Sequence, residues 1–204
     1  MQDIFYCVYI YAMNEQRVHK LVLHPSAPGF ALPSWDRLIR GLQAMEFLDK
    51  AFANDSDKRY LVGERFLQYI TFMGCSPSVE LTPPANGSLD FCHVRFSDIY
   101  TQPRFRRATQ SVFARCPHCR KRMNNWETAI SHWLIDPHAE NFQCDKCANS
   151  VSVFQVGWRH TAAFACLFMD IYSIYPQEGI PTDQFLSELD ALSGCQWNYF
   201  FTDQ

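Results

Sequence analysis

Cys116-Pro117-His118-Cys119 and, after residues 120–143, Cys144-Asp145-Lys146-Cys147 are two pairs of cysteines, each with two residues between its members. Two intervening residues allow a tight turn to direct both sulfurs at one ion, and zinc prefers four such ligands at the corners of a tetrahedron. The sequence therefore predicts one structural Zn2+ bound by Cys116, Cys119, Cys144 and Cys147. Because protein ligands fill all four positions, we expect no open position for catalysis.

Paired cysteines also support other chemistries. A rubredoxin-like site would hold iron in the same four-cysteine geometry. A thioredoxin-like dithiol needs only one pair, at the start of a helix in a βαβ unit. Histidine can also replace a cysteine at zinc, but with four cysteines present we expect the nearby histidines at the surface or beside the ligands: His118, His132 and His138.

The residues around the cysteines indicate a small module. Residues 112–157 are expected to contain, in this order, a strand, a cysteine pair, an insert with a short helix at 124–134, the second cysteine pair and a strand at 151–156. This order resembles the zinc-ribbon group, which implies binding of nucleic acid, of the ribosome or of another protein. Residues 66–77 followed by 91–94 resemble a group of uncharacterised bacterial proteins with the same kind of module. That resemblance implies a bacterial cytoplasmic protein and supplies no activity.

The whole chain has the composition of a folded protein. Of its 204 residues, 48% are apolar, 19% are charged and a high 15% are aromatic, with 17 Phe, 9 Tyr and 5 Trp. This composition excludes the disordered, collagen-like and coiled-coil classes. We predict an α+β fold with a mixed, aromatic-rich core at residues 1–108 and an inserted or appended zinc ribbon at 109–157. C-terminal helices and a strand at 158–204 are expected to pack on the core.

Hydrophobic periodicity predicts the elements of the core. One helix is expected to start after an N-terminal cap at Ser34 and to run from residue 35 to residue 48 or 52. Two more helices are expected over residues 158–175 and 182–192, and Gly194 is expected to end the last one. Strands are expected at residues 4–13, 17–24, 79–81, 91–96 and 197–201, while residues 64–73 fit either state. Nine apolar side chains are predicted to be buried: Trp35, Leu38, Ile39, Leu42, Phe164, Phe168, Phe185, Leu189 and Trp197.

The sequence predicts a cytoplasmic protein. The longest apolar run, residues 161–175, is interrupted by Asp170 and is shorter than the roughly 20 residues of a membrane span. The first residues show no basic segment followed by a small-residue cleavage site. Nine cysteines are an odd number, which indicates metal binding and free thiols rather than a disulfide framework.

Charge is distributed unevenly along the chain. The net charge is −3, yet residues 99–160 hold nine Lys and Arg against four Asp and Glu, and residues 161–204 hold six Asp and Glu and no Lys or Arg. Arginine binds phosphate through two parallel hydrogen bonds and stacks on bases, and Phe105, Phe113 and Trp126 alternate with the cations of this region. The basic cluster consists of Arg104, Arg106, Arg107, Arg115, Arg120, Lys121 and Arg122.

We therefore expect a non-enzymatic protein that binds structured RNA, or a ribonucleoprotein such as the ribosome, through the basic cluster. The alternative is a protein–protein adaptor or regulatory factor with a purely structural zinc site, whose basic cluster meets an acidic protein. Two further alternatives involve no external partner: the cations form a surface that contacts only water, or they contact the acidic residues 161–204 of the same chain.

An enzyme is the third class considered. Cys75 follows Gly74, and His93 adjoins Cys92, but a Cys–His nucleophile requires the two side chains within hydrogen-bond reach. Cysteine is among the most buried residue types, so we expect core thiols instead. The chain contains no G-x-x-x-x-G-K-[ST], no G-x-G-x-x-G and no H-E-x-x-H motif.

Overall fold

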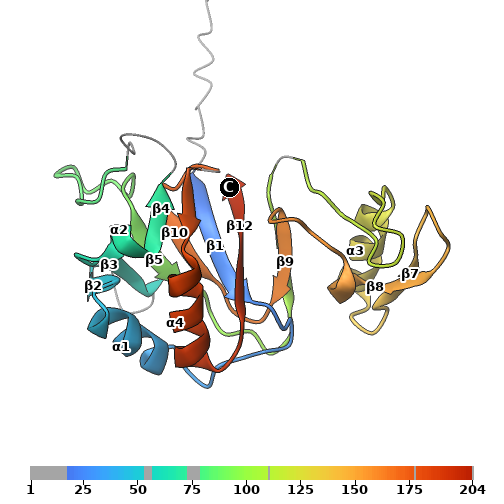
Figure 1. The fold of residues 1–204 in the computed structure, drawn as a ribbon, viewed down its shortest axis with the longest axis horizontal. Helices are drawn as coiled ribbons and strands as arrows, with labels where there is room; N and C mark the ends of the chain where they lie inside the picture. The colour runs from blue at the N-terminus through green and yellow to red at the C-terminus, as the bar shows by residue number, and fades with distance from the viewer. Residues whose placement is uncertain (1–17, 53–56, 73–78, 110, 177, 204) are drawn as a thin grey trace, which may run out of the picture.

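The computed structural model describes residues 18–52, 57–72, 79–109, 111–176 and 178–203. Within these residues α-helices combine with antiparallel strands (Figure 1), which confirms the α+β class. The strand predicted at residues 4–13, as well as Cys75, lies outside the described residues. None of the described helices has the length and apolar character that crossing a membrane requires.

The largest element is a six-stranded antiparallel sheet. The strands lie in the order β12 (Trp197–Asp203), β1 (His19–Pro25), β10 (Met169–Tyr172), β5 (His93–Phe96), β3 (Arg59–Val62) and β2 (Leu48–Ala51). Each neighbouring pair is antiparallel. The strands predicted at residues 17–24, 91–96 and 197–201 correspond to β1, β5 and β12.

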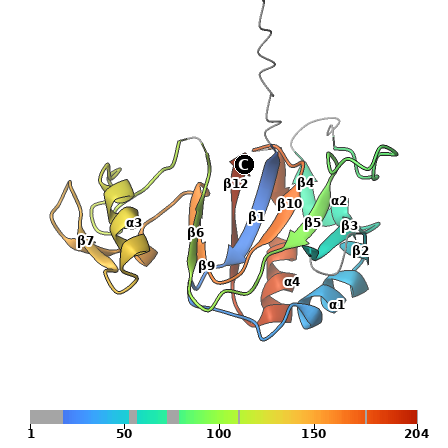
Figure 2. The same cartoon turned by 180° about the vertical axis from the view of Figure 1, so that it is seen from behind.

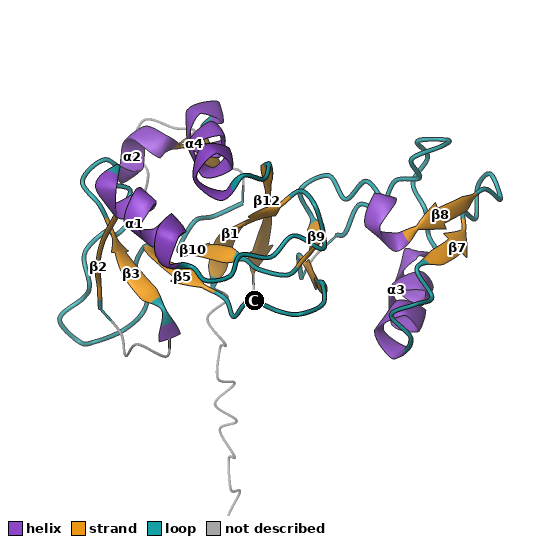
Figure 3. Ribbon diagram, turned by 90° about the horizontal axis from the view of Figure 1, so that it is seen from below, coloured by secondary structure: helices purple, strands orange, loops and turns teal. Residues whose placement is uncertain are grey.

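Helices cover one face of this sheet (Figure 3). α1 (Asp36–Ala44) and α4 (Asp183–Ser193) contact each other, and α2 (Phe66–Tyr69) leads into β4 (Ile70–Phe72), which pairs with β11 (Gly179–Pro181). Aromatic rings fill the space beneath the helices. The Phe47 ring centroid lies 4.2 Å from that of Phe185 and 5.2 Å from that of Phe66. The high aromatic share of the sequence therefore supplies this core.

The opposite face of the sheet carries a hairpin. β6 (Arg104–Arg107) pairs with β9 (Ala162–Ala165), and Figure 2 shows the pair beside β1 and β12. Three of the four β9 residues are alanines, whose small side chains allow the hairpin to approach the sheet closely. Ala163 and Ala165 are buried in one apolar cluster with side chains from the sheet and the segment before β10: Val22, Phe168 and Phe200.

The module that contains the cysteines is an insertion in this hairpin. The chain leaves β6 at Arg107 and returns to β9 at Ala162, and these two residues are paired. The intervening residues form α3 (Trp126–Ile135), the paired strands β7 (Asn141–Gln143) and β8 (Ser150–Ser152), and a 3-10 turn at Val153–Gln155. Figure 1 shows the insertion at one end of the molecule, beyond β9. Of the two predicted arrangements, inserted or appended, the structure has the inserted one.

The first helix ends earlier than predicted. α1 stops at Ala44, because the N–H of Phe47 donates back to the carbonyl of Leu42 in a Schellman motif. The motif needs a residue in the left-handed region, and Glu46 occupies that position with a φ of 60°. Glycine usually stands there, so the sequence carries no recognisable stop signal.

The two helices on the sheet also start differently. The predicted cap at Ser34 is wrong, since Trp35 occupies the cap position of α1 and no side chain makes a cap hydrogen bond. α4 agrees with its prediction. The hydroxyl of Thr182 accepts from the N–H of Phe185 at 3.1 Å, and the helix ends at Gly194, whose φ is 79°.

The helix predicted at residues 158–175 is wrong, because this segment forms β9 and β10. Every residue from 162 to 172 is buried. A continuous buried run has no period, so a buried helix and a strand covered on both faces look alike in sequence. β10 lies in the sheet between the helices and the hairpin, whereas β9 lies in the hairpin, with Ala163 and Ala165 packed against the sheet and Ala162 and Phe164 packed against the insertion.

Three smaller predictions are also resolved. Residues 79–81 form no strand. Residues 64–73 contain both α2 and β4, and residues 151–156 divide between the end of β8 and the 3-10 turn. All nine side chains predicted to be buried are buried: Trp35, Leu38, Ile39, Leu42, Phe164, Phe168, Phe185, Leu189 and Trp197.

Candidate metal centre

The two cysteine pairs form two turns of the same design. In the first turn, the N–H of Arg120 donates to the carbonyl of Cys116 at 2.9 Å, and the N–H of Cys116 donates to the carbonyl of Lys121 at 3.1 Å. The second turn repeats both hydrogen bonds at 2.9 and 3.0 Å, with Ala148 in the place of Arg120. Arg120 and Ala148 each have a φ of 58°. The repeated spacing in the sequence thus produces a repeated backbone geometry.

These turns bring four sulfurs together. The Sγ atoms of Cys116, Cys119, Cys144 and Cys147 all lie within 4.8 Å of one another. The Sγ atoms of Cys116 and Cys147 are 3.8 Å apart. That distance fits an edge of a tetrahedron with metal–sulfur bonds of about 2.3 Å, and it is far longer than the disulfide bond of about 2.05 Å. The four side chains therefore fit one tetrahedral metal ion.

The neighbouring thiols influence one another. The pKa of Cys147 is raised to about 11: a hydrogen bond from the backbone of Asn149 lowers it, but burial and the neighbouring thiols together raise it more. The N–H of Lys146 points to the sulfur of Cys144 at 3.4 Å, where it stabilises a thiolate. Metal ligation requires thiolates, so binding of a divalent ion at this site releases protons.

A second apolar core supports the cysteines. Phe164 of β9 lies in it, with its ring centroid 4.8 Å from that of Phe105, 4.9 Å from that of Trp133 and 5.0 Å from that of Phe154. Cys116 and Cys144 are buried in the same cluster. Packing therefore connects the sulfur site to the hairpin that carries the insertion.

The histidines lie away from the four sulfurs. Among the described residues, the only group of side chains close enough to share a metal ion is the four cysteines. His118 is exposed, and its Nε2 donates to the carbonyl of Ser150 at 3.2 Å, which links the first turn to β8. His132 and His138 are exposed on α3 and after it.

The basic cluster divides into exposed and internal cations. Arg106 forms an ion pair with Asp170, and Arg115 is half-buried. The other members are exposed, and none of them pairs with a carboxylate within the described ranges. These five exposed cations are Arg104, Arg107, Arg120, Lys121 and Arg122.

Several exposed cations lie over aromatic rings. The guanidinium carbon of Arg122 is 4.8 Å from the centre of the Phe113 ring, and that of Arg107 is 5.9 Å from the centre of the Trp126 ring. Phe113 remains 40% exposed. Of the three aromatic residues predicted to alternate with cations, Phe105 and Trp126 are half-buried and pack against the second core.

His93 is buried in the core, and other residues contact both of its ring nitrogens. It is fully buried, and its Nδ1 donates to the carbonyl of Phe91 at 2.9 Å, while its Nε2 accepts from Arg59 at 2.6 Å. The ring stacks on Tyr172 at 4.3 Å. Burial lowers the pKa of His93 to about 4. These contacts occupy both ring nitrogens, and Cys75 lies outside the described residues.

Sequence reasoning missed Arg159 and His160. They form a turn between the insertion and β9, and the Nδ1 of His160 donates to the carbonyl of Tyr199 at 2.7 Å. Both have left-handed φ values, of 49° and 59°. Neither residue is glycine or asparagine, so no signal in the sequence marks this turn.

The chain was compared with family models, with curated proteins and with solved structures, and no match was found in any of the three comparisons.

Proposed function

We propose that this protein binds nucleic acid, with structured RNA or a ribonucleoprotein favoured, through the five exposed cations. The observation that carries the proposal is that these cations, three of which directly follow the first cysteine pair and two of which lie on β6, have no carboxylate partners in the described part of the chain. A charge that the fold does not neutralise is available to phosphate, and guanidinium groups bind phosphate through paired hydrogen bonds. Phosphate contacts supply most of the affinity for nucleic acid and position the protein on it.

We assign the metal as Zn2+, one ion per chain, in a structural role. The four-cysteine donor set and the 3.8 Å separation between two of its sulfurs support this assignment. Zn2+ bound by four thiolates carries a net charge of about −2 by formal count. Arg120, Lys121 and Arg122 follow the first pair directly in the sequence. Bound zinc would hold the two turns together and thereby fix the backbone from which these cations project.

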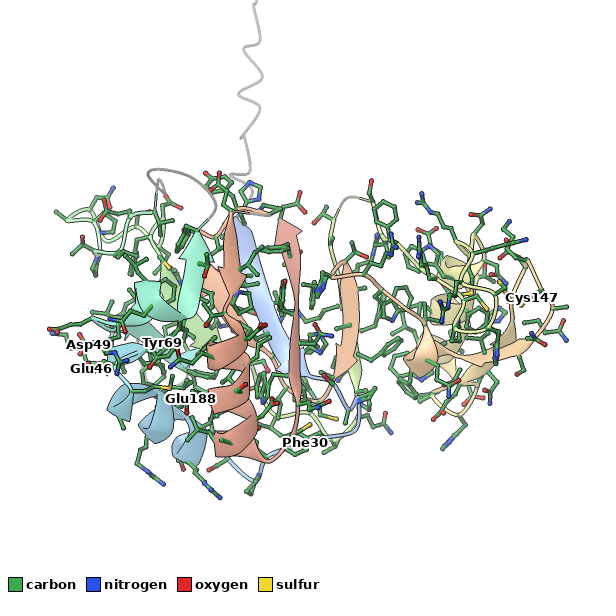
Figure 4. The ribbon with its side chains drawn as sticks, viewed as in Figure 1. Phe30, Glu46, Asp49, Tyr69, Cys147 and Glu188 are labelled. Atoms are coloured by element: carbon green, nitrogen blue, oxygen red, sulfur yellow. The ribbon has the colours of Figure 1, made fainter. Side chains whose placement is uncertain are left out.

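Three of the acidic residues in 161–204 are held within the fold or lie far from the insertion. Asp170 is occupied by Arg106, and the Oδ1 of Asp190 accepts from the N–H of Trp197 at 2.9 Å. Figure 4 shows Glu188 on α4 and Cys147 in the insertion far apart in the molecule. Repulsion between solvent-exposed charges is largely screened beyond about 8 Å at physiological salt.

Salt titration tests the proposal. Wild-type protein should bind a structured RNA, such as a ribosomal RNA fragment, and log K should fall linearly with log salt because bound counterions are released. Pull-downs from a cell lysate with and without nuclease should show partners that disappear on nuclease treatment. Absence of binding to RNA and DNA at low salt would overturn the proposal. Elemental analysis of protein purified without chelator tests the metal, and iron or no metal would contradict the assignment.

One observation favours a protein–protein adaptor as the second candidate. Leu134 and Ile135 at the end of α3 are 62% and 83% exposed, although both are large and apolar. An exposed apolar pair on the inserted module fits a contact with another protein. Capture of a protein after nuclease treatment, lost in a Leu134→Ser/Ile135→Ser variant, would support the adaptor.

A further inference from the structure

A cavity of about 670 Å3 lies where the insertion leaves and rejoins the hairpin. This volume falls within the range of about 300–1,000 Å3 that is usual for ligand sites. Its walls come from the start of the insertion, from the turn before β9 and from the outer strand β12. Aromatic and basic side chains line it together with one acidic residue, among them Phe113, Arg159, His160, Tyr199, Phe201 and Asp203.

The turn at Arg159 and His160 holds one wall in a strained conformation. The N–H of Thr161 donates to the carbonyl of Trp158 at 3.0 Å, and both central residues have positive φ, as in a type I′ turn. Non-glycine residues in this region are strained and concentrate at ligand sites. Here the strain is stabilised by the hydrogen bond from His160 to β12 and by its stacking on Tyr199 at 4.4 Å.

The cavity is continuous with the basic cluster through one side chain. Phe113 lines the cavity, and the guanidinium of Arg122 lies over its ring. The N–H of Phe113 donates to the hydroxyl of Thr161 at 2.9 Å, so this wall is fixed to the strained turn. Phosphates bound by Arg122 would therefore lie next to an aromatic surface, with Arg159 as a further cation on the same cavity.

We propose that this cavity receives an unpaired base of the bound nucleic acid, stacked on Phe113, with the adjoining phosphates on Arg122 and Arg159. This inference rests on the proposed function and adds which part of the nucleic acid is recognised. Unpaired bases stack on aromatic side chains, and arginine at the edge of the same site donates hydrogen bonds to their phosphates. The bases of an intact duplex face one another and cannot enter, so a single strand, loop or bulge is the ligand.

The test compares single and double strands of the same RNA. Oligouridine that carries one 2-aminopurine is titrated into the full chain, alone and annealed to its complement, and 2-aminopurine fluorescence reports stacking. A Phe113→Leu variant keeps an apolar side chain and removes the ring. We expect it to weaken single-strand binding about 5- to 150-fold, the effect of losing one base–aromatic stack, and to abolish the fluorescence change. Duplex binding should stay within about twofold.

Two further variants complete the design. Leu89→Ala changes an exposed apolar residue that does not line the cavity and should leave both affinities unchanged. Arg159→Gln should weaken single-strand binding and serves as the second variant if Phe113→Leu does not fold. Wild-type protein that binds RNA, with Phe113→Leu or Arg159→Gln binding single strands equally well, would overturn this inference and leave the proposed function standing. Wild-type protein that binds neither strand nor duplex at low salt would overturn both.

Discussion

Arg106 on β6 and Asp170 on β10 are joined by two hydrogen bonds, from Nη1 to Oδ1 at 2.7 Å and from Nη2 to Oδ2 at 3.1 Å. The side chain of Asp170 is only 6% exposed, and the guanidinium of Arg106 also lies 4.7 Å above the centre of the Phe168 ring. The pair fastens the hairpin to the sheet. One arginine of the basic cluster thus serves the fold, while Arg104, two residues earlier on the same strand, is exposed.

Replacement of Arg106 by alanine should lower the free energy of unfolding by about 3 kcal/mol. The variant leaves Asp170 in the interior without its partner, and loss of one member of a buried pair costs about 3–5 kcal/mol. We expect the lower end because the Arg106 side chain keeps 23% exposure. Chemical denaturation measures the change. Arg104→Ala is the matched control on the same strand, and it should change stability by less than about 0.5 kcal/mol while weakening RNA binding. Equal destabilisation by both variants would show that the ion pair has no special role.

Loss of the metal should loosen the insertion and spare the sheet. Trp126, Trp133 and Trp158 lie in or against the second core, whereas Trp35 and Trp197 belong to the core beneath the helices. In Cys144→Ser, or in the wild-type chain with a chelator, we expect tryptophan emission to shift to the red as the first three become solvated. Strand signals in circular dichroism should largely persist.

The control for the metal experiment is Cys195→Ser, which changes a cysteine outside the sulfur site. It should keep one zinc per chain and the wild-type emission. A single cooperative loss of all structure in Cys144→Ser would contradict the separation of the two cores. Unchanged emission on metal removal would show that packing around Phe164 holds the insertion without the ion.

Two buried histidines should make stability depend on pH. Burial lowers the pKa values of both His24 and His93 to about 4, from the ordinary value of 6.5. Between these values the unfolded chain binds protons that the folded chain excludes, so stability is complete above about pH 6.5 and falls as the pH decreases toward 4. Each histidine should contribute a slope of about 1.4 kcal/mol per pH unit.

Urea denaturation between pH 7 and 5 measures this slope, in a range where most carboxylates stay ionised. In His24→Gln the slope should fall by about half, because His93 alone remains. A free energy of unfolding that is constant over this range would mean that the two rings accept protons in the folded state without cost, which their burial opposes.

Much of the fold follows from local patterns in the sequence, and the errors have physical causes. Thr182 and Gly194 bound α4 as their residue types predict. Glu46 ends α1 from a position that favours glycine, which sequence reasoning does not detect. The run from residue 162 to 172 was misread as a helix because the layers that cover its two faces come from distant parts of the chain.

The metal site and the basic cluster differ in how far the sequence specifies them. The spacing of Cys116 and Cys119 with Cys144 and Cys147 specifies the ligand group, since each pair needs only its own turn. Whether a cation of the basic cluster is exposed or forms an internal ion pair depends on residues that are distant in the sequence. Arg106 meets Asp170, which lies 64 residues away in the chain, and no local signal distinguishes it from Arg104. The turn at Arg159 was missed for the same reason, because β12 supports it.

Charge reversal on the first cysteine turn should weaken nucleic-acid binding on all sequences alike. In Arg120→Glu/Lys121→Glu/Arg122→Glu, the phosphate contacts are lost, and these carry no sequence information directly. The slope of log K against log salt should become shallower by about 2–3, since each lost phosphate contact removes about 0.7–0.9. Zinc content and fold should not change, because the three side chains are exposed and are not ligands.

Arg37→Glu/Arg40→Glu/Lys50→Glu makes the same change in charge at exposed positions on and near α1, at the other end of the molecule (Figure 1). If binding depends on the local cluster, this control should keep nearly the wild-type slope; an equal loss in both variants would mean that net charge alone drives binding and that the first turn is not the contact site.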